Sequence, residues 1–224
     1  CTSGSLSIGL AYEAIRHGQQ TVMVAGGAEE MSISQAAVFD SLFATSTRND
    51  APTTTPRPFD TDRDGMVVGE GAASFVLEDL DHATARGATI HAEVVGFGTN
   101  SDGHHVTQPT METMAAAMRL AMDDADLSPE QVGYVNAHGT ATDLGDTAES
   151  LATYKALAYP VPISSLKSYM GHTLGACGSI EAWITIAMMQ RDWFAPTINL
   201  DRVDERCAEL DYIVGDGRDM QAEY

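Results

Sequence analysis

The sequence predicts an α/β layered fold, and two observations indicate it. Short apolar runs typical of strands alternate with longer segments that repeat apolar residues at helical spacing. In addition, 44% of the 224 residues are hydrophobic, which is enough to build a buried core. The apolar runs fall far short of the ~20 residues that cross a bilayer, so we expect no membrane segment.

The first half of the chain is expected to alternate between helices and strands. Small and apolar residues at helical spacing predict the first helix, and Gly18 is placed to end it. The first strand is expected to end at Gly26 and Gly27. We expect helices at residues 3–17 and 80–86, strands at 21–25, 72–77 and 90–97, and a polar, Pro-rich loop at 44–64.

The second half continues the alternation. Residues 111–124 have the apolar spacing of an amphipathic helix. Ser128, followed by Pro and Glu, is typical of a helix start. The last predicted helix, 175–189, is apolar nearly all round and is expected to be fully buried. The remaining elements are strands at 132–135 and 161–164 and a helix at 144–157.

Charge and cysteine content exclude several functions. The net charge is −20, and the chain has two lysines, so nucleic-acid binding is not expected, because phosphate contacts need basic residues. Cys1, Cys177 and Cys207 are odd in number and widely spaced, unlike a disulfide framework or a set of metal ligands. Unpaired cysteines suit a reducing compartment, so we expect a cytoplasmic protein.

Cys1 is the first candidate for chemistry. It precedes the first predicted helix, where unpaired backbone N–H groups and the helix dipole favour a nucleophilic thiolate. Its position alone leaves a second interpretation open, that a cysteine at the start marks only a boundary. Because the chain begins with Cys rather than Met, we expect it to be either processed or a fragment.

Two histidine motifs supply further candidates. His138 follows a predicted strand in the run NAHGTATDLGD, and α/β sheets place functional groups at the carboxyl ends of strands. Lys167 lies five residues before His172 in the run SSLKSYMGHTLG, next to the apolar helix. A lysine there is costly unless it is paired or functional, and Glu149 is the expected partner. Each histidine taken alone is better explained as the cap of a turn.

Five segments together carry a specific resemblance, and in chain order they are CTSGSLSIG, AGGAEE, RPFDTDRDGMVVGEGA, NAHGTATDLGD and SSLKSYMGHTLGACGSIEA. They resemble the β-ketoacyl-acyl-carrier-protein synthases, which are condensing enzymes of the thiolase fold. The elongating enzymes are the most similar, because the initiating ones have Asn where this chain has His172. The resemblance implies a thiolase-like layered α-β-α-β-α fold, here incomplete, lacking the N-terminal half-sheet and the last C-terminal strands. Residues 1–90 would belong to its N-terminal half and residues 91–224 to its C-terminal half.

The resemblance also implies the reaction and its central residues. Cys1 would accept an acyl chain from acyl carrier protein. His138 and His172, as neutral imidazoles, would bind the thioester carbonyl of malonyl-acyl carrier protein and stabilise the enolate formed as CO2 leaves. Lys167 would maintain the electrostatics of the site. The product would be 3-oxoacyl-acyl carrier protein, made without a metal or an organic cofactor by an acyltransferase that forms a homodimer.

Five further residues receive supporting roles from the resemblance. Thr140 and Thr142 would bind the phosphopantetheine arm of the carrier. Asp146 and Glu149 would orient the histidine and lysine loops from behind. Met66 stands where the family usually has Phe, on the malonyl side of the site, and its flexible side chain can fill a similar space.

Chains of this family are longer, with strands before the nucleophile and a Gly-Phe-Gly-Gly-Thr-Asn loop near the C-terminus that supplies an oxyanion N–H. We therefore expect a fragment that is inactive when isolated, because losing one oxyanion donor costs ~2.7–4 kcal/mol of transition-state stabilisation.

Two other functions remain open. An N-terminal-nucleophile hydrolase would explain why Cys is residue 1, but not the histidine and lysine motifs. A non-catalytic chain-length partner subunit would lack the nucleophile that is present here. Docking of an acidic acyl carrier protein needs basic groups, for which Arg48, Arg57 and Arg63 are candidates, although scattered solvated arginines are equally expected.

Overall fold

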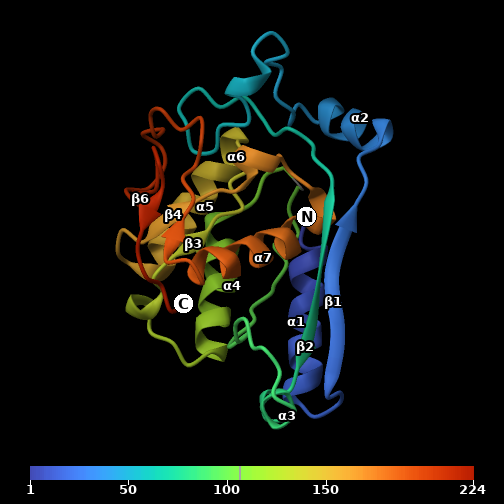
Figure 1. Ribbon diagram of the computed structural model, residues 1–224. Coiled ribbons are helices and arrows are strands. Elements are labelled where there is room, and N and C mark those ends of the chain that lie inside the picture. The colour runs from blue at the N-terminus through green and yellow to red at the C-terminus, as the bar shows by residue number, and fades with distance from the viewer. Residues whose placement is uncertain (106) are drawn as a thin grey trace.

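The computed structural model describes residues 1–105 and 107–224 (Figure 1). The α-helices are α1 (Ser3–Arg16), α2 (Ile33–Ser41), α3 (Leu80–Ala85), α4 (Met111–Asp124), α5 (Asp143–Leu157), α6 (Lys167–Met170) and α7 (Cys177–Met189). The 3₁₀ turns are η1 (Pro52–Thr54), η2 (Pro129–Gln131) and η3 (Leu174–Ala176). The strands are β1 (Val22–Glu29), β2 (Gly71–Glu78), β3 (Val135–Asn136), β4 (Pro162–Ser164), β5 (Trp193–Phe194), β6 (Asp211–Tyr212) and β7 (Arg218–Asp219). This order confirms the predicted α/β class.

β1 and β2 form a long antiparallel pair that packs along α1 (Figure 1). β1 runs through Gly26 and Gly27, whereas the sequence predicted that it would end there. A β-carbon on Gly26 would lie 2.1 Å from the carbonyl oxygen of Ala73, and one on Gly27 would lie 2.8 Å from that of Gly175. The two glycines therefore do not end the strand but allow β2 and η3 to approach it closely.

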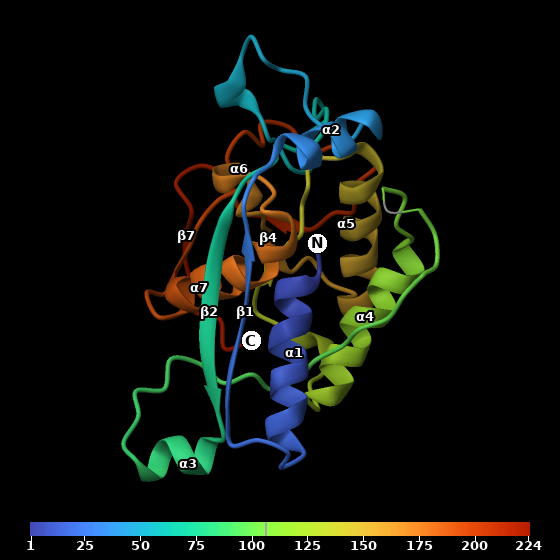
Figure 2. The same cartoon turned by 90° about the vertical axis from the view of Figure 1, so that its right-hand side faces the viewer.

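The C-terminal part is built on a small parallel sheet with the strand order β3-β4-β6. α4 and α5 pack together beside it, and α1 lies between the β1–β2 pair and α4 (Figure 2). A buried apolar cluster that includes Ala115, Ala152 and Ile163 fills the space between α4, α5 and the small sheet. Because β3 and β4 are parallel neighbours, the loops that follow them leave the sheet at the same edge. The His138 loop and the Lys167 helix are therefore neighbours.

Residues 90–97 form no strand in the described part of the chain, so that prediction is wrong. Their backbone bonds to side chains instead. The Phe97 N–H donates to Oδ2 of Asp124 (3.0 Å), and the Val95 carbonyl accepts from the Tyr12 hydroxyl (3.0 Å). These two backbone groups thus bond to side chains of α1 and α4 rather than in a strand ladder.

Several helical segments differ from the prediction, and the short helix α6 was not predicted. Ser128 begins only the 3₁₀ turn η2 rather than a longer helix. α2 was not predicted, although Ser32 and Gln35 form a capping box at its start. α7 is only partly buried, because Trp183 on its outer face is 59% exposed and no described segment covers it. Among residues 1–105 and 107–224, no helix has the length and apolarity needed to cross a membrane.

Candidate active site

The three side chains that the sequence singled out as reactive come together in space. Sγ of Cys1 and one ring nitrogen each from His138 and His172 all lie within 4.8 Å of one another. Cys1 is exposed and precedes α1, whereas the histidines follow β3 and α6. The two rings are 4.9 Å apart between centroids and stand at 87° to each other. Segments far apart in the sequence therefore form one cluster.

Glu149 of α5 fixes the turn that carries His138. Its buried carboxylate accepts hydrogen bonds from the backbone N–H groups of His138 (2.6 Å) and Gly139 (2.7 Å). The prediction that Glu149 would pair with Lys167 is wrong, because the Lys167 ammonium forms its ion pair with Glu181.

Lys167 is 1% exposed, and its ammonium group is paired inside the protein. Nζ donates to Glu181 of α7 and lies 3.2 Å from Nδ1 of His138. Glu181 was not among the sequence candidates. It could have been found, because an acidic residue in an otherwise apolar helix is costly unless it has a partner, and a buried lysine needs one too.

The hydrogen bonds at Nδ1 fix the tautomer of both histidines. Nδ1 of His172 accepts from the backbone N–H of Leu174 at 3.1 Å, so this nitrogen carries no proton. Nδ1 of His138 faces the Lys167 ammonium, which can only donate. In the neutral state each ring therefore keeps its proton on Nε2. The site presents two Nε2–H donors.

Burial keeps both imidazoles neutral. Burial, followed by the nearby charge of Lys167, lowers the pKa of His172 to about 3. The same two causes, in the same order, hold the pKa of His138 well below its ordinary value. Neither ring is therefore positively charged near pH 7, and neither can act as a general acid there.

The cluster has the residue types of a metal site, but its histidine ring nitrogens are protonated in a way that does not suit metal binding. One cysteine and two histidines are common zinc ligands. A ring nitrogen that binds a metal gives up its proton, and the other nitrogen then donates a hydrogen bond. In both His138 and His172 that other nitrogen already faces a donor. The arrangement therefore favours hydrogen-bond donors over metal ligands.

The turn after His138 brings two predicted binding residues into contact with each other. The hydroxyl oxygens of Thr140 and Thr142 are 2.8 Å apart and are partly accessible. Asp146 lies behind them, fully buried, and accepts from the backbone N–H groups of Phe59 (2.7 Å) and Ala141 (3.1 Å). Burial raises the pKa of Asp146 to about 7. Asp146 thus holds the threonine turn in place.

Met66 lies on a segment that runs past His172. The backbone of His172 bonds on both sides to this segment, donating to the Val67 carbonyl (2.7 Å) and accepting from the Gly69 N–H (2.9 Å). The Met66 side chain is 5% exposed. It is therefore packed into the protein next to the histidine segment.

Arg57 and Arg63 do not form a docking surface. Both are buried, at 7% and 8% exposed, and each is held by carboxylates. Arg57 pairs with Asp60 at 2.9 Å, and Arg63 pairs with Asp204 at 2.7 Å. From the sequence, these arginines were expected either to form a basic docking patch or to be solvated separately. Neither expectation holds for Arg57 and Arg63, because both are buried and paired with carboxylates.

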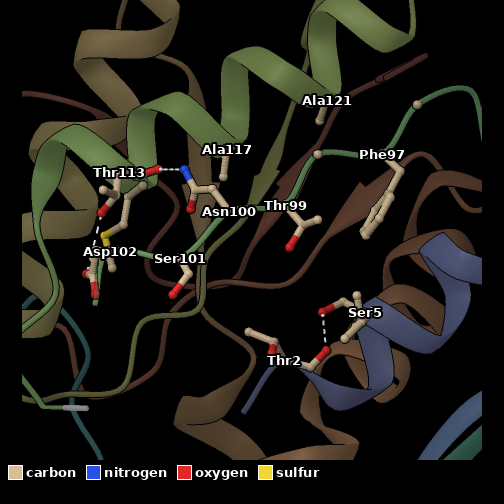
Figure 3. Close-up of a pocket in the computed structure, with 14 residues that line it drawn as sticks. Thr2, Ser5, Phe97, Thr99, Asn100, Ser101, Asp102, Thr113, Ala117 and Ala121 are labelled. Atoms are coloured by element: carbon tan, nitrogen blue, oxygen red, sulfur yellow. Dashed lines mark hydrogen bonds between the residues drawn. The ribbon is translucent and has the colours of Figure 1, made fainter. Parts of the chain in front are cut away.

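A cavity of about 520 Å³ opens between the N-terminus of α1 and α4 (Figure 3). Thr2 and Ser5 line one side, and a loop that includes Asn100 lines the other. The Asn100 side chain donates to the carbonyl of Thr113 in α4 at 2.8 Å. The Cys-His-His cluster does not line this cavity. The candidate chemistry therefore lies outside this cavity.

Comparison with known proteins supports the family resemblance over most of the chain. Residues 1–83 match the model of the β-ketoacyl synthase N-terminal domain, and residues 91–201 match that of its C-terminal domain. The chain is 49% identical over 212 residues to 3-oxoacyl-[acyl-carrier-protein] synthase 2 of Vibrio cholerae, covering 92% of this chain and 51% of that protein. The chain spans about half the length of the curated relatives it matches.

Two solved structures confirm the predicted thiolase-like fold. A β-ketoacyl synthase from Burkholderia phymatum superimposes with a TM-score of 0.98 at 65% identity, over 99% of this chain and 54% of that one. A ketosynthase bound to a hexaketide, in complex with a type II polyketide acyl-carrier protein, gives 0.94 at 35% identity, over 99% and 56%. The chain belongs to the β-ketoacyl synthase family.

Proposed function

We propose that the protein containing this chain condenses an acyl thioester with malonyl-acyl carrier protein and releases CO2, in fatty-acid or polyketide elongation. The observation that carries the proposal is the thiol of Cys1 within 4.8 Å of ring nitrogens of two neutral histidines. The Vibrio cholerae relative and the carrier-bound ketosynthase support the choice of acyl carrier protein as partner.

In the first half-reaction Cys1 takes the acyl chain. Its thiolate attacks the acyl thioester carbonyl, and the thiol of the carrier's phosphopantetheine leaves. The N-terminal end of α1 stabilises the attacking thiolate, because its unpaired N–H groups and dipole favour negative charge. No metal or organic cofactor takes part in the proposed step.

In the second half-reaction the histidine pair acts on the malonyl group. The Nε2–H groups of His138 and His172 donate to the malonyl thioester oxygen. As the bond to the carboxylate breaks, CO2 leaves and the electron pair moves into an enolate whose oxygen both donors stabilise. The enolate carbon attacks the acyl-Cys1 carbonyl, and the Cys1 thiolate departs from the new 3-oxoacyl product.

The remaining site residues are proposed to position these groups. Lys167 holds His138 in the Nε2–H tautomer through its contact with Nδ1. The partly accessible hydroxyls of Thr140 and Thr142 bind the phosphopantetheine arm, and Met66 borders the malonyl side. Asp146 and Glu149 hold the turns beneath them, as their bonds to backbone N–H groups indicate.

We also propose the setting of the protein. Residues 1–90 and 91–224 belong to the two pseudo-equivalent halves of the fold, which the matches at 1–83 and 91–201 support. Three free cysteines are consistent with a cytoplasmic location. A homodimer is proposed from the family resemblance.

The test is a condensation assay on the protein that contains this chain. With acyl- and malonyl-acyl carrier protein, we expect 3-oxoacyl-acyl carrier protein and one CO2 per product, measured by mass spectrometry and gas capture. Cys1→Ala should abolish the product, whereas Cys207→Ala, which removes a buried thiol outside the cluster, should retain it. Hydrolysis of acyl groups without chain extension would contradict the proposal and favour a hydrolase.

A further inference from the structure

Cys177 is a second thiol directly behind the candidate nucleophile, and the proposed reaction does not use it. Its Sγ donates to the backbone carbonyl of Cys1 at 3.3 Å, and its side chain is 1% exposed. One ring nitrogen of His138 also lies within 4.8 Å of this sulfur. His138 is therefore flanked by the thiols of Cys1 and Cys177.

The two cysteines stand at the starts of two helices that touch. Cys1 precedes α1, and Cys177 is the first residue of α7. A β-carbon on Gly4 would lie 2.9 Å from the backbone nitrogen of Ser179, and one on Gly178 would lie 2.9 Å from the β-carbon of Ser5. The first turns of α1 and α7 are thus in backbone contact, which fixes the separation of the cysteines.

The Cys177 sulfur lies next to the backbone of Cys1. A carbonyl oxygen lies about 2.4 Å from the Cα atom of its own residue. Sγ of Cys177 is therefore no more than about 5.7 Å from the Cα atom of Cys1, so rotation about the Cα–Cβ bond of Cys1 can turn its sulfur toward that of Cys177.

We propose that Cys1 and Cys177 form a reversible disulfide under peroxide stress, which switches the site off and protects the nucleophile. The Cys1 thiolate attacks one oxygen of hydrogen peroxide, the O–O bond breaks, and hydroxide leaves, so that Cys1 becomes a sulfenic acid. The Cys177 sulfur then attacks the Cys1 sulfur. The S–O bond breaks, and the hydroxyl leaves as water with the proton of Cys177. A dithiol reductant restores both thiols.

The two environments suit this division of roles. Cys1 precedes the N-terminus of α1, which favours the thiolate that peroxide oxidises. Burial raises the pKa of Cys177, which keeps this thiol protonated and shielded from peroxide itself. The loss of condensation on oxidation rests on the proposed function, whereas formation of the disulfide does not.

The experiment is peptide mapping of the protein that contains this chain, after hydrogen peroxide and before and after dithiothreitol. We expect a cross-linked pair of peptides bearing Cys1 and Cys177, lighter by two hydrogens than the separate thiol peptides, and released by reduction. Alkylation of Cys1 by iodoacetamide should be lost on oxidation and fully recovered. Oxidation of Cys1 to sulfinic acid without a cross-link would overturn the proposal.

Variants separate the disulfide from a general effect of oxidation. In Cys177→Ala and Cys177→Ser, recovery of the Cys1 thiol should be lost, because the sulfenic acid proceeds to an irreversible product. Cys207→Ala should recover like the wild type. Equal recovery in the Cys177 variants would contradict the proposal. A cross-link that forms while the wild type shows no condensation would preserve this inference and refute the proposed function.

Discussion

At the scale of single residues, the position of one proton on each histidine decides what the cluster can do. Leu174 N–H and the Lys167 ammonium occupy Nδ1 of His172 and His138, which leaves Nε2–H as the free donor. Two neutral N–H donors can stabilise an oxyanion by hydrogen bonding. Two imidazolium ions would instead act as acids, and two deprotonated ring nitrogens would instead bind a metal. The chemistry therefore depends on groups next to the histidines as much as on the histidines themselves.

The tautomers can be observed directly. Nitrogen-15 NMR of the histidine side chains should show His138 and His172 as neutral Nε2–H forms at pH 7. The His172 signal should remain neutral down to about pH 5, because burial lowers its pKa to about 3. A neutral Nδ1–H form or an imidazolium at pH 7 would contradict the assignment.

The buried His172 also predicts how stability depends on pH. Its folded pKa of about 3 lies below that of an exposed histidine, ~6.5, so the unfolded chain binds the proton first as the pH falls. The stabilisation is present above pH ~6.5 and is lost progressively as the pH falls toward 3. His172→Asn, which keeps a side-chain acceptor for Leu174, should remove this dependence.

The measurement is urea denaturation of the wild type and His172→Asn between pH 7 and pH 4.5. Well below pH 6.5, the slopes of unfolding free energy against pH should differ by about one proton, roughly 1.4 kcal/mol per pH unit. Parallel slopes would show that His172 titrates normally in the folded protein.

At the scale of elements, α6 and α7 are joined by the buried pair of Lys167 and Glu181. Both side chains lie largely out of water, at 1% and 8% exposed. Removing one partner of such a pair strands the other charge in the interior. The pair therefore couples the helix that carries the lysine to the helix that begins behind Cys1.

A mutant cycle tests this coupling. Glu181→Gln should lower the free energy of unfolding by about 3–5 kcal/mol, and the double variant Lys167→Met/Glu181→Leu should recover most of that loss. The matched control is Glu112→Gln, which removes the exposed partner of Lys155 and should cost no more than about 1 kcal/mol. A loss at Glu181 as small as at Glu112 would contradict the coupling.

The elements also show what a sequence can and cannot predict. α4 was predicted with its observed bounds, because its apolar residues recur at regular helical spacing. β1 was predicted too short, because the glycines in its sequence do not reveal that other backbone segments pack closely against them. A strand was wrongly predicted at residues 90–97, because an apolar run alone does not show whether a partner strand lies beside it. Glu181 was missed although an acidic residue in an apolar helix signals a buried partner; which residue is that partner could not be predicted, since Lys167 is 14 positions away in another helix.

At the scale of the whole molecule, the fold brings together pieces that the sequence keeps apart. The turn with His138 follows β3, and α6 with the His172 segment follows β4, the parallel neighbour of β3. The β1–β2 pair packs against both α1 and η3, which places Cys1 near the same region. The family resemblance implied that Cys1, His138 and His172 would meet, and the structure places their reactive atoms within 4.8 Å of one another. Their separate roles, acyl acceptance by the thiol and CO2 release by the histidines, remain the central proposal.

The most direct test measures these two steps separately in the protein that contains this chain. His138→Ala and His172→Ala should still accept a labelled acyl group on Cys1, while CO2 release from malonyl-acyl carrier protein falls by roughly 10²–10³-fold for each. Cys1→Ala should lose acyl labelling, and Cys207→Ala should behave like the wild type in both assays. Histidine variants that release CO2 at the wild-type rate would contradict the account.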